Sequence, residues 1–199
     1  MQIFKASSVV SSCILDRNYI HDSVVFVVED GNTDYVGVSI GQNNVIMAGS
    51  VIFAGSSFRE NTVIGNNNYI GTGTTIAADA FIGNNNTLEG SNFLNHHSCI
   101  LNHATLEYGA TITSYSTVGS WAIIGTLSPL VKDAKPFSKV FGNPAVSKGI
   151  NASKNFKNHF SEVEALEIKQ YIKDSTYPVS PYIVSILDEF ENHSRKKAL

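Results

Sequence analysis

The chain has 199 residues, with 14 Lys and Arg against 17 Asp and Glu, a formal net charge of −3 and 16% charged residues. This size allows one domain with an appendage, and the absence of Lys/Arg blocks argues against nucleic acid as the main partner. No apolar run reaches membrane-spanning length and the first 20 residues lack the order of a signal peptide, so we expect a cytoplasmic protein without a membrane span. Cys13 and Cys99 are then expected to be thiols.

Residues 1–39 contain short apolar runs that do not share the frame of the following segment. Ile14 and Ile20 are six positions apart, and Asp30-Gly31-Asn32 has the composition of a turn. These features predict an irregular N-terminal coil or a pair of strands over residues 1–39.

A repeat of six residues organises the segment 40–135. A large apolar residue returns at every sixth position, without an insertion, and the positions are Ile40, Ile46, Ile52, Phe58, Ile64, Ile70, Ile76, Ile82, Leu88, Leu94, Ile100, Leu106, Ile112, Val118, Ile124 and Leu130. A period of six fits neither an amphipathic helix nor an open sheet. It predicts a three-sided prism with one short strand per side, eighteen residues per coil and about five coils.

Glycine and asparagine are expected to form the corners of this prism. Six glycines directly follow an inward apolar residue, namely Gly41, Gly65, Gly71, Gly83, Gly119 and Gly125. We expect unusual φ and ψ angles at these glycines. Asparagine also tolerates such corners, and the motif Ile-Gly-Asn-Asn-Asn at 64–68 returns at 82–86. We therefore expect asparagine side chains to hydrogen-bond along the stack.

The C-terminal segment breaks the repeat. Pro136 and Gly142-Asn143-Pro144 predict an exit loop and linker over residues 136–160. Ser161 and Glu164 have capping-box spacing and predict a helix over about 161–174, while Ser180 and Pro181 predict the start of a second helix within 161–199. Two short helices cannot form a core alone, so we expect them to pack on the last coil or on a neighbouring subunit.

Three of the six histidines lie within eight residues, at His96, His97 and His103. Because Ile, Leu and Val fill the prism, any site must lie on its outside. His97 and His103 each follow an inward residue by three positions, so they occupy equivalent places on adjacent corners, point apart and do not converge on one metal within a chain. Histidine is suited to proton transfer near neutral pH. From spacing alone, His96 is either a solvated corner residue or a catalytic base.

The repeat resembles that of the left-handed parallel β-helix acyltransferases. Segments 94–100, 109–112 and 121–125 are similar to the catalytic region of the N-acetyltransferases that act on nucleotide-linked 4-amino sugars, and of related sialic acid O-acetyltransferases. His96 matches their catalytic histidine in phase. Two positions depart from the family pattern, because His97 stands where a carboxylate is usual and Ser114 stands where a glycine offers its N–H to the thioester oxygen.

The tail resembles a second branch of the same family. Segment 141–145 is similar to the exit segment of hexapeptide acetyltransferases. Segment 148–161 is similar to the start of the helical domain of UDP-N-acetylglucosamine acyltransferase, which uses an acyl carrier protein thioester.

The resemblance implies a mainly β fold, a left-handed parallel β-helix of hexapeptide repeats with a short C-terminal α-helical tail. It implies acetyl-CoA-dependent N-acetylation of a nucleotide-linked amino sugar for surface polysaccharide or lipopolysaccharide synthesis, in a homotrimer with its active site between two prisms. His96 would be the general base and the N–H of Ser114 would bind the oxyanion. The other expected contacts are Trp121, Gly125 and Asn143 for the acyl donor, and Asn95, His97 and His103 for the nucleotide sugar.

Three alternatives remain open from the sequence. The first is a sugar acyltransferase that uses an acyl carrier protein. The second is a zinc enzyme like the γ-class carbonic anhydrases, whose paired histidines are five apart, whereas the spacings here are six and seven. The third is a β-helix that serves only as a binding or assembly module.

Overall fold

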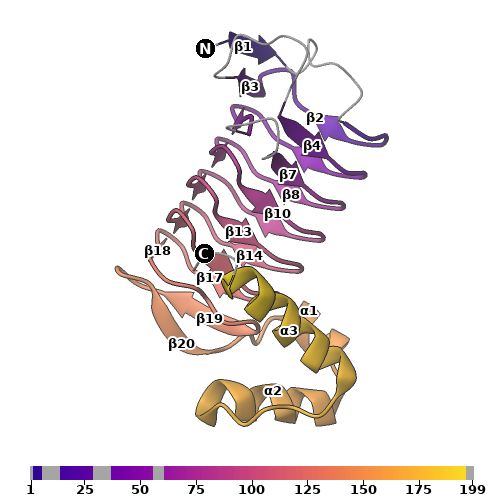
Figure 1. The fold of residues 1–199 in the computed structure, drawn as a ribbon, viewed down its shortest axis with the longest axis vertical. Helices are drawn as coiled ribbons and strands as arrows, with labels where there is room; N and C mark the ends of the chain where they lie inside the picture. The colour runs from indigo at the N-terminus through magenta and orange to yellow at the C-terminus, as the bar shows by residue number, and fades with distance from the viewer. Residues whose placement is uncertain (1, 6–13, 29–36, 56–60, 196–199) are drawn as a thin grey trace.

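The computed structural model describes residues 2–5, 14–28, 37–55 and 61–195, which form a prism of short strands followed by helices (Figure 1). Three sheets make the sides. Sheet A contains β1 (Gln2–Lys5), β3 (Val25–Val28), β6 (Val51–Phe53), β9 (Thr75–Ile76), β12 (Phe93–Leu94), β15 (Thr111–Ile112) and β18 (Pro129–Leu130). Sheet B contains β4 (Val38–Ile40), β7 (Thr62–Ile64), β10 (Phe81–Ile82), β13 (Cys99–Ile100) and β16 (Thr117–Val118). Sheet C contains β2 (Tyr19–Ile20), β5 (Val45–Ile46), β8 (Tyr69–Ile70), β11 (Thr87–Leu88), β14 (Thr105–Leu106), β17 (Ile123–Ile124), β19 (Ser138–Phe141) and β20 (Val146–Ile150).

The core is a column of stacked aliphatic side chains inside the prism. The strands from β2 to β19 pair in parallel with strands one coil away, so that Ile64, Ile82 and Ile100 stack in register and are buried. Equivalent columns run along the other two sheets. The fold predicted from the sequence, a left-handed parallel β-helix with a short helical tail, is confirmed.

The prediction of an uninterrupted repeat from residue 40 is wrong. Paired residues are 18 positions apart between Ile64 and Leu130, but Ile40 pairs with Ile64 at a separation of 24. The connection between β6 and β7 is therefore six residues longer than the other corners. Phe58 belongs to this connection and lies outside the described residues.

Before the regular coils, residues 14–28 form a coil of less regular spacing. Ile14 bridges to Ile40, β2 pairs with β5 and β3 pairs with β6, so residues 14–28 supply three further sides. β1 adds an antiparallel strand beside β3. The turn expected at 30–32 lies outside the part of the chain that the structure describes.

The expected conformation of the corner glycines is also wrong. None of the six glycines after an inward residue has a positive φ. They are small because the next coil approaches closely, and a Cβ on Gly83 would lie 2.9 Å from the carbonyl oxygen of Leu101. The left-handed residues come two positions later, as at Asn85 (φ 58°) and His103 (φ 58°). These are residue types that tolerate this region better than most.

Two asparagine ladders confirm the predicted hydrogen bonding along the stack. In the buried ladder, Asn68 donates to Asn44 at 3.0 Å through its side chain, and the backbone N–H of Asn86 donates to Asn68 at 2.9 Å. In the outer ladder, the Asn66 and Asn84 backbones donate to Asn84 and Asn102. The ladders fix the stacking of successive corners.

Segment 136–160, expected to be a loop and linker, contains regular structure. β19 extends sheet C beside β17, β20 returns antiparallel to it, and α1 spans Lys154–His159. β19 forms because Val140 continues the inward column of the prism. α1 is held by Phe156 and Phe160, which pack against Trp121 and Phe137.

The helices pack on the last coil of their own chain. α2 spans Glu162–Asp174, with the predicted capping box of Ser161 and Glu164, and α3 spans Pro181–Arg195. A second apolar cluster joins α1, α2 and α3 to Trp121 and Phe137 of the prism. In Figure 1, α3 runs back along the prism, and it contacts β16 of sheet B.

Candidate active site

His96 and Ser114 lie one above the other on the corner between sheets A and B, which we call the A–B corner. Both are exposed, and Ser114 is one coil after His96. The His96 ring has no hydrogen bond to a described residue, and the N–H of Ser114 likewise donates none within the described chain. An exposed imidazole and an available backbone donor are therefore on one edge of the prism.

The neighbours of His96 hold the same corner in place. The Asn95 side chain donates to the carbonyl oxygen of Ile112 at 3.1 Å. His97 stacks on Tyr115, with ring centroids 4.8 Å apart, and its Nε2 lies 3.8 Å from Oδ2 of Asp79. Asp79 is one coil earlier and its side chain is only 3% exposed. A carboxylate, that of Asp79, therefore lies beside His97, which itself stands at the position where the family pattern usually has a carboxylate.

His103 and Trp121 lie on a different corner, between sheets B and C (the B–C corner). Their rings stack at 4.4 Å with an interplanar angle of 7°, and His159 of α1 lies against Trp121 at 4.6 Å. Burial, and then the nearby His159, lowers the pKa of His103 below its usual value. The imidazole of His103 is consequently kept neutral more readily than that of a solvated histidine.

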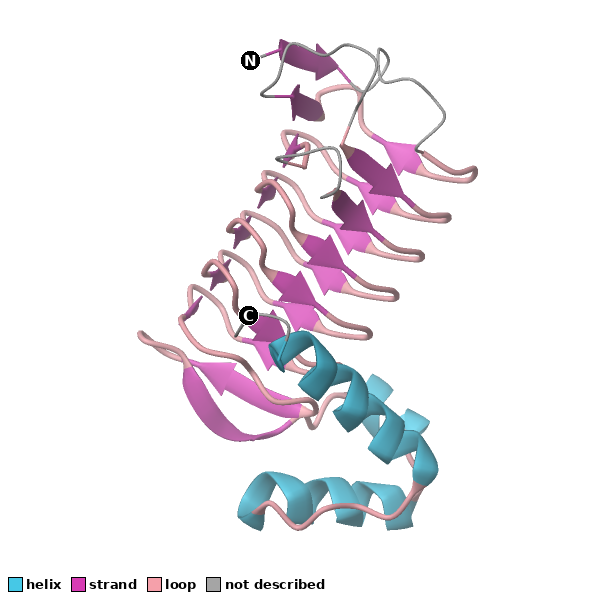
Figure 2. Ribbon diagram, in the orientation of Figure 1, coloured by secondary structure: helices cyan, strands magenta, loops and turns pink. Residues whose placement is uncertain are grey.

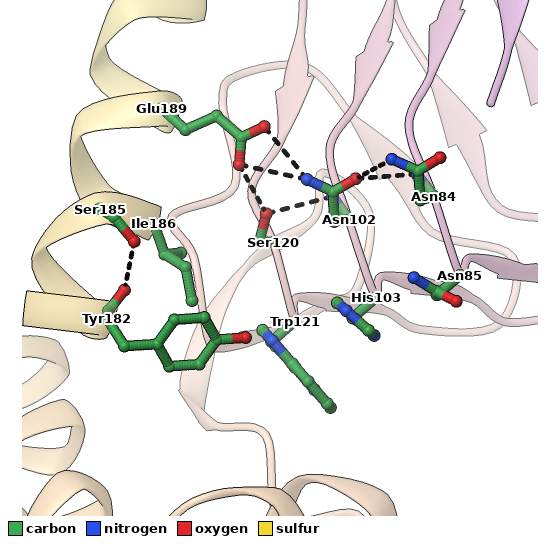
Figure 3. Close-up of a pocket in the computed structure, with 10 residues that line it drawn as sticks. All are labelled: Asn84, Asn85, Asn102, His103, Ser120, Trp121, Tyr182, Ser185, Ile186 and Glu189. Carbon is green, nitrogen blue, oxygen red and sulfur yellow. Dashed lines mark hydrogen bonds between the residues drawn. The ribbon is translucent and has the colours of Figure 1, made fainter. Parts of the chain in front are cut away.

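A pocket of about 440 Å³ opens between the B–C corner and α3 (Figure 3). Asn102, His103 and Trp121 line it from the prism, while Tyr182 and Glu189 line it from α3. The Glu189 carboxylate accepts two hydrogen bonds from Asn102, at 3.1 and 3.2 Å. Sequence reasoning missed this pocket, because no spacing in the repeat shows where a helix 87 residues further along will dock.

The third corner, between sheets C and A (the C–A corner), carries the remaining predicted residues. Gly125 lines a hollow of about 390 Å³ together with Glu107, Lys139 and Phe141. The ammonium groups of Lys139 and Lys148 lie 5.9 and 6.0 Å from the centroid of the Phe141 ring. Asn143 is exposed in the turn between β19 and β20. A single chain thus distributes the predicted site residues over three corners.

The described part of the chain contains neither a candidate metal cluster nor a candidate membrane span. In the described ranges, no three His, Cys, Asp or Glu side chains form a group that could hold a metal ion. None of the described helices has the length and apolar character needed to cross a membrane.

Comparison with known proteins gives matches to this fold among solved structures. No family model and no curated protein matches the chain. Among solved structures, it is similar to the UDP-N-acetylglucosamine acyltransferase of Arabidopsis, with a TM-score of 0.72 and 28% identity over 89% of this chain and 64% of that one. The chain therefore spans less than two thirds of the length of the Arabidopsis enzyme.

Two bacterial structures share the fold at lower identity. The acetyltransferase domain of PglB from Neisseria gonorrhoeae matches with a TM-score of 0.56 and 24% identity, over 65% of this chain and 57% of that one, and that domain has also been solved with acetyl coenzyme A. The UDP-N-acetylglucosamine acyltransferase of Francisella novicida matches with a TM-score of 0.54 and 18% identity, over 92% and 84%. The resemblance to left-handed β-helix acyltransferases that the sequence predicted is confirmed.

Proposed function

We propose that this chain is an acyltransferase that transfers the acetyl group of acetyl-CoA to the amine of a nucleotide-linked amino sugar. The observation that carries the proposal is the A–B corner, where the exposed His96 and the available N–H of Ser114 lie one coil apart. The likeness to a UDP-N-acetylglucosamine acyltransferase at 28% identity supports it. A product of this kind serves surface polysaccharide or lipopolysaccharide synthesis.

In this mechanism His96 accepts a proton as the sugar amine attacks the thioester carbonyl. The N–H of Ser114 donates a hydrogen bond to the oxyanion that forms, and the thiolate of the donor then leaves as the carbonyl is restored. His96 has no described partner that fixes its tautomer. We assign Asn95 and His97 to substrate contact, with Asp79 holding His97 in place through the 3.8 Å contact.

The hollow at the C–A corner supports the assignment of the acyl donor to this corner. Lys139 lines it and Lys148 lies near its Phe141, so two cations face the same region. Cations of this kind attract the phosphates of a coenzyme A thioester. Gly125 and Asn143 are assigned to this contact because they belong to the same corner and to the adjacent turn.

A homotrimer would bring these parts together. The A–B corner and the C–A corner are separate edges of one prism, so a single chain does not bring the donor hollow and His96 to one edge. A neighbouring copy that presents its C–A corner to His96 would complete the site. Closed rings of identical subunits generate such shared sites.

A second candidate is acyl transfer to UDP-N-acetylglucosamine from an acyl carrier protein. One comparison favours it specifically, because the Arabidopsis enzyme aligns with 89% of the chain, whereas the PglB domain aligns with 65%. The two candidates share the role of His96 and differ in acceptor and donor.

Thermal denaturation with ligands tests the proposal. The purified chain is heated with acetyl-CoA, free CoA, zinc and a panel of UDP- and dTDP-linked amino sugars, because a ligand that binds only the folded state raises the midpoint. We expect a rise with acetyl-CoA and with one aminosugar nucleotide. No rise with CoA and a rise with UDP-N-acetylglucosamine would favour the carrier-protein candidate. A rise with zinc alone would contradict both.

A further inference from the structure

The pocket between the B–C corner and α3 contains a buried donor with no acceptor. Trp121 is only 6% exposed, and its indole Nε1–H makes no hydrogen bond with any residue in the described ranges. His103 and His159 pack on the ring, and the indole N–H is the polar atom of Trp121 that remains buried without a partner among the described residues. Buried donors in folded proteins have partners, and a ligand oxygen in this pocket would supply one.

The opposite wall of the pocket is a carboxylate that lacks a counter-ion. Glu189 accepts hydrogen bonds from Asn102 and from Ser120, at 3.5 Å for the latter, and forms no ion pair within the described chain. The outer asparagine ladder ends here, because Ser120 stands where the next asparagine would be. Oε2 accepts from both Asn102 and Ser120, whereas Oε1 accepts only from Asn102 and has a further lone pair that can accept a hydrogen bond from a ligand.

The remaining lining is neutral, polar and aromatic. It includes the amide of Asn85, the hydroxyl of Ser185 and the ring of Tyr182, and none of the described Lys or Arg residues lines the pocket. Figure 3 shows these groups around one opening, with Glu189 and Asn102 on one side and Trp121 and Tyr182 on the other. A pocket with a carboxylate and without cations disfavours phosphates, so it does not suit a nucleotide or the phosphate end of coenzyme A.

We propose that this pocket binds a hydroxylated ring of the sugar type, without phosphate. Adjacent hydroxyl groups can donate to Glu189 and accept from the Trp121 N–H at the same time, and an amine substituent would strengthen the contact with the carboxylate. The volume of about 440 Å³ is within the range of small-molecule sites. The site is on a different corner from His96 and does not rest on the proposed reaction.

The single tryptophan of the chain makes the proposal directly testable. In the 15N-labelled chain one indole N–H resonance reports this pocket, and it is followed during titration with glucose, glucosamine and glucose 6-phosphate. We expect a saturable shift with glucose and an equal or tighter response with glucosamine. Glucose 6-phosphate is expected to bind at least about fivefold more weakly than glucose.

Two matched variants control for indirect effects. Asn85 lines the pocket, whereas Asn67 occupies the equivalent place one coil earlier. The two residues have the same left-handed backbone, with φ of 58° at Asn85 and 56° at Asn67. Asn85→Ala should weaken glucose binding by about fivefold or more, through loss of a hydrogen bond, and Asn67→Ala should leave it unchanged. An indole resonance that glucose and glucosamine leave unmoved, tight binding of glucose 6-phosphate, or equal weakening by both variants would overturn the proposal.

Discussion

At the scale of single residues, two kinds of small residue build the corners for different reasons. Gly71 and Gly73 are only two positions apart, yet Gly71 has an ordinary φ and faces the backbone of the next coil. Gly73 has a φ of 71°, and a Cβ there would make only an ordinary contact, 3.6 Å from Oγ of Ser91. In a sequence the two look alike. The prediction of unusual angles at Gly71 was wrong because close approach between coils, rather than torsion, selects glycine there.

This difference predicts unequal effects of the same substitution. A Cβ at position 71 would lie 2.8 Å from the backbone nitrogen of Gly90, so Gly71→Ala should lower the free energy of unfolding by about 3 kcal/mol. Gly73→Ala meets no clash and should cost about 1 kcal/mol for its left-handed backbone. Equilibrium unfolding in urea measures both values, and equal losses would contradict this explanation.

His103 should make stability depend on pH. Its pKa is lowered in the folded state by burial and by His159, so below the unfolded value of about 6.5 the unfolded chain binds a proton that the folded chain resists. The stability that the neutral His103 contributes is fully present above pH 6.5 and is lost as the pH falls below 6.5. Between pH 7.5 and pH 5.5, wild type should lose more unfolding free energy than His103→Gln. The same loss in both proteins would exclude His103 as the cause.

At the scale of elements, the helix ends follow local rules and were predicted well. Ser161 and Glu164 form both hydrogen bonds of a capping box. At the other end of α2, Ser175 has a φ of 62°, a conformation that glycine adopts without strain. The sequence showed the first feature and not the second, because a serine gives no sign that the backbone is left-handed.

Substitutions at the two ends of α2 should therefore change stability in opposite directions. Ser161→Ala removes the cap and should destabilise the protein by about 1 kcal/mol, whereas Ser175→Gly relieves the left-handed residue and should stabilise it by up to about 1 kcal/mol. Urea unfolding followed by circular dichroism at a helix-sensitive wavelength measures both. A stabilising Ser161→Ala or a clearly destabilising Ser175→Gly would refute the assignment.

The repeat predicted the prism but concealed its longer connection. The six additional residues between β6 and β7 equal one repeat, so the apolar position at Phe58 kept the period unbroken. The strand pairing reveals it, because Ile40, Ile46 and Ile52 each pair with the residue 24 positions later. The β19–β20 hairpin was hidden for another reason, since Pro136 and Pro144 indicate a break without showing that the intervening strand rejoins sheet C.

At the scale of the whole molecule, the predicted site is incomplete in one chain. The sequence could place His96 and Ser114 on the same corner, because positions 18 apart in a regular repeat must stack. The positions of Trp121, Gly125 and His96 in the repeat place them on three different corners of one prism. They contain no information about how a neighbouring prism would bring these corners together.

A shared site predicts complementation between inactive variants. His96→Ala alters the A–B corner and Lys139→Glu alters the C–A hollow, so each trimer of one variant should be inactive. After mixing, unfolding and refolding together, random trimers should recover about one quarter of wild-type activity, because that fraction of interfaces has both intact partners. Light scattering should give three times the mass of one chain. A monomeric mass or no recovery would exclude the shared site.

The most direct test of the central proposal is the rate of thioester consumption by wild type and His96→Ala, measured with acetyl-CoA and the aminosugar nucleotide that raises the thermal midpoint. The His96 ring is exposed and has no described partner, so the variant should unfold at the wild-type temperature. Loss of a general base predicts a rate lower by about 10²–10⁴. Full activity in a folded His96→Ala protein would show that the reaction does not use this corner.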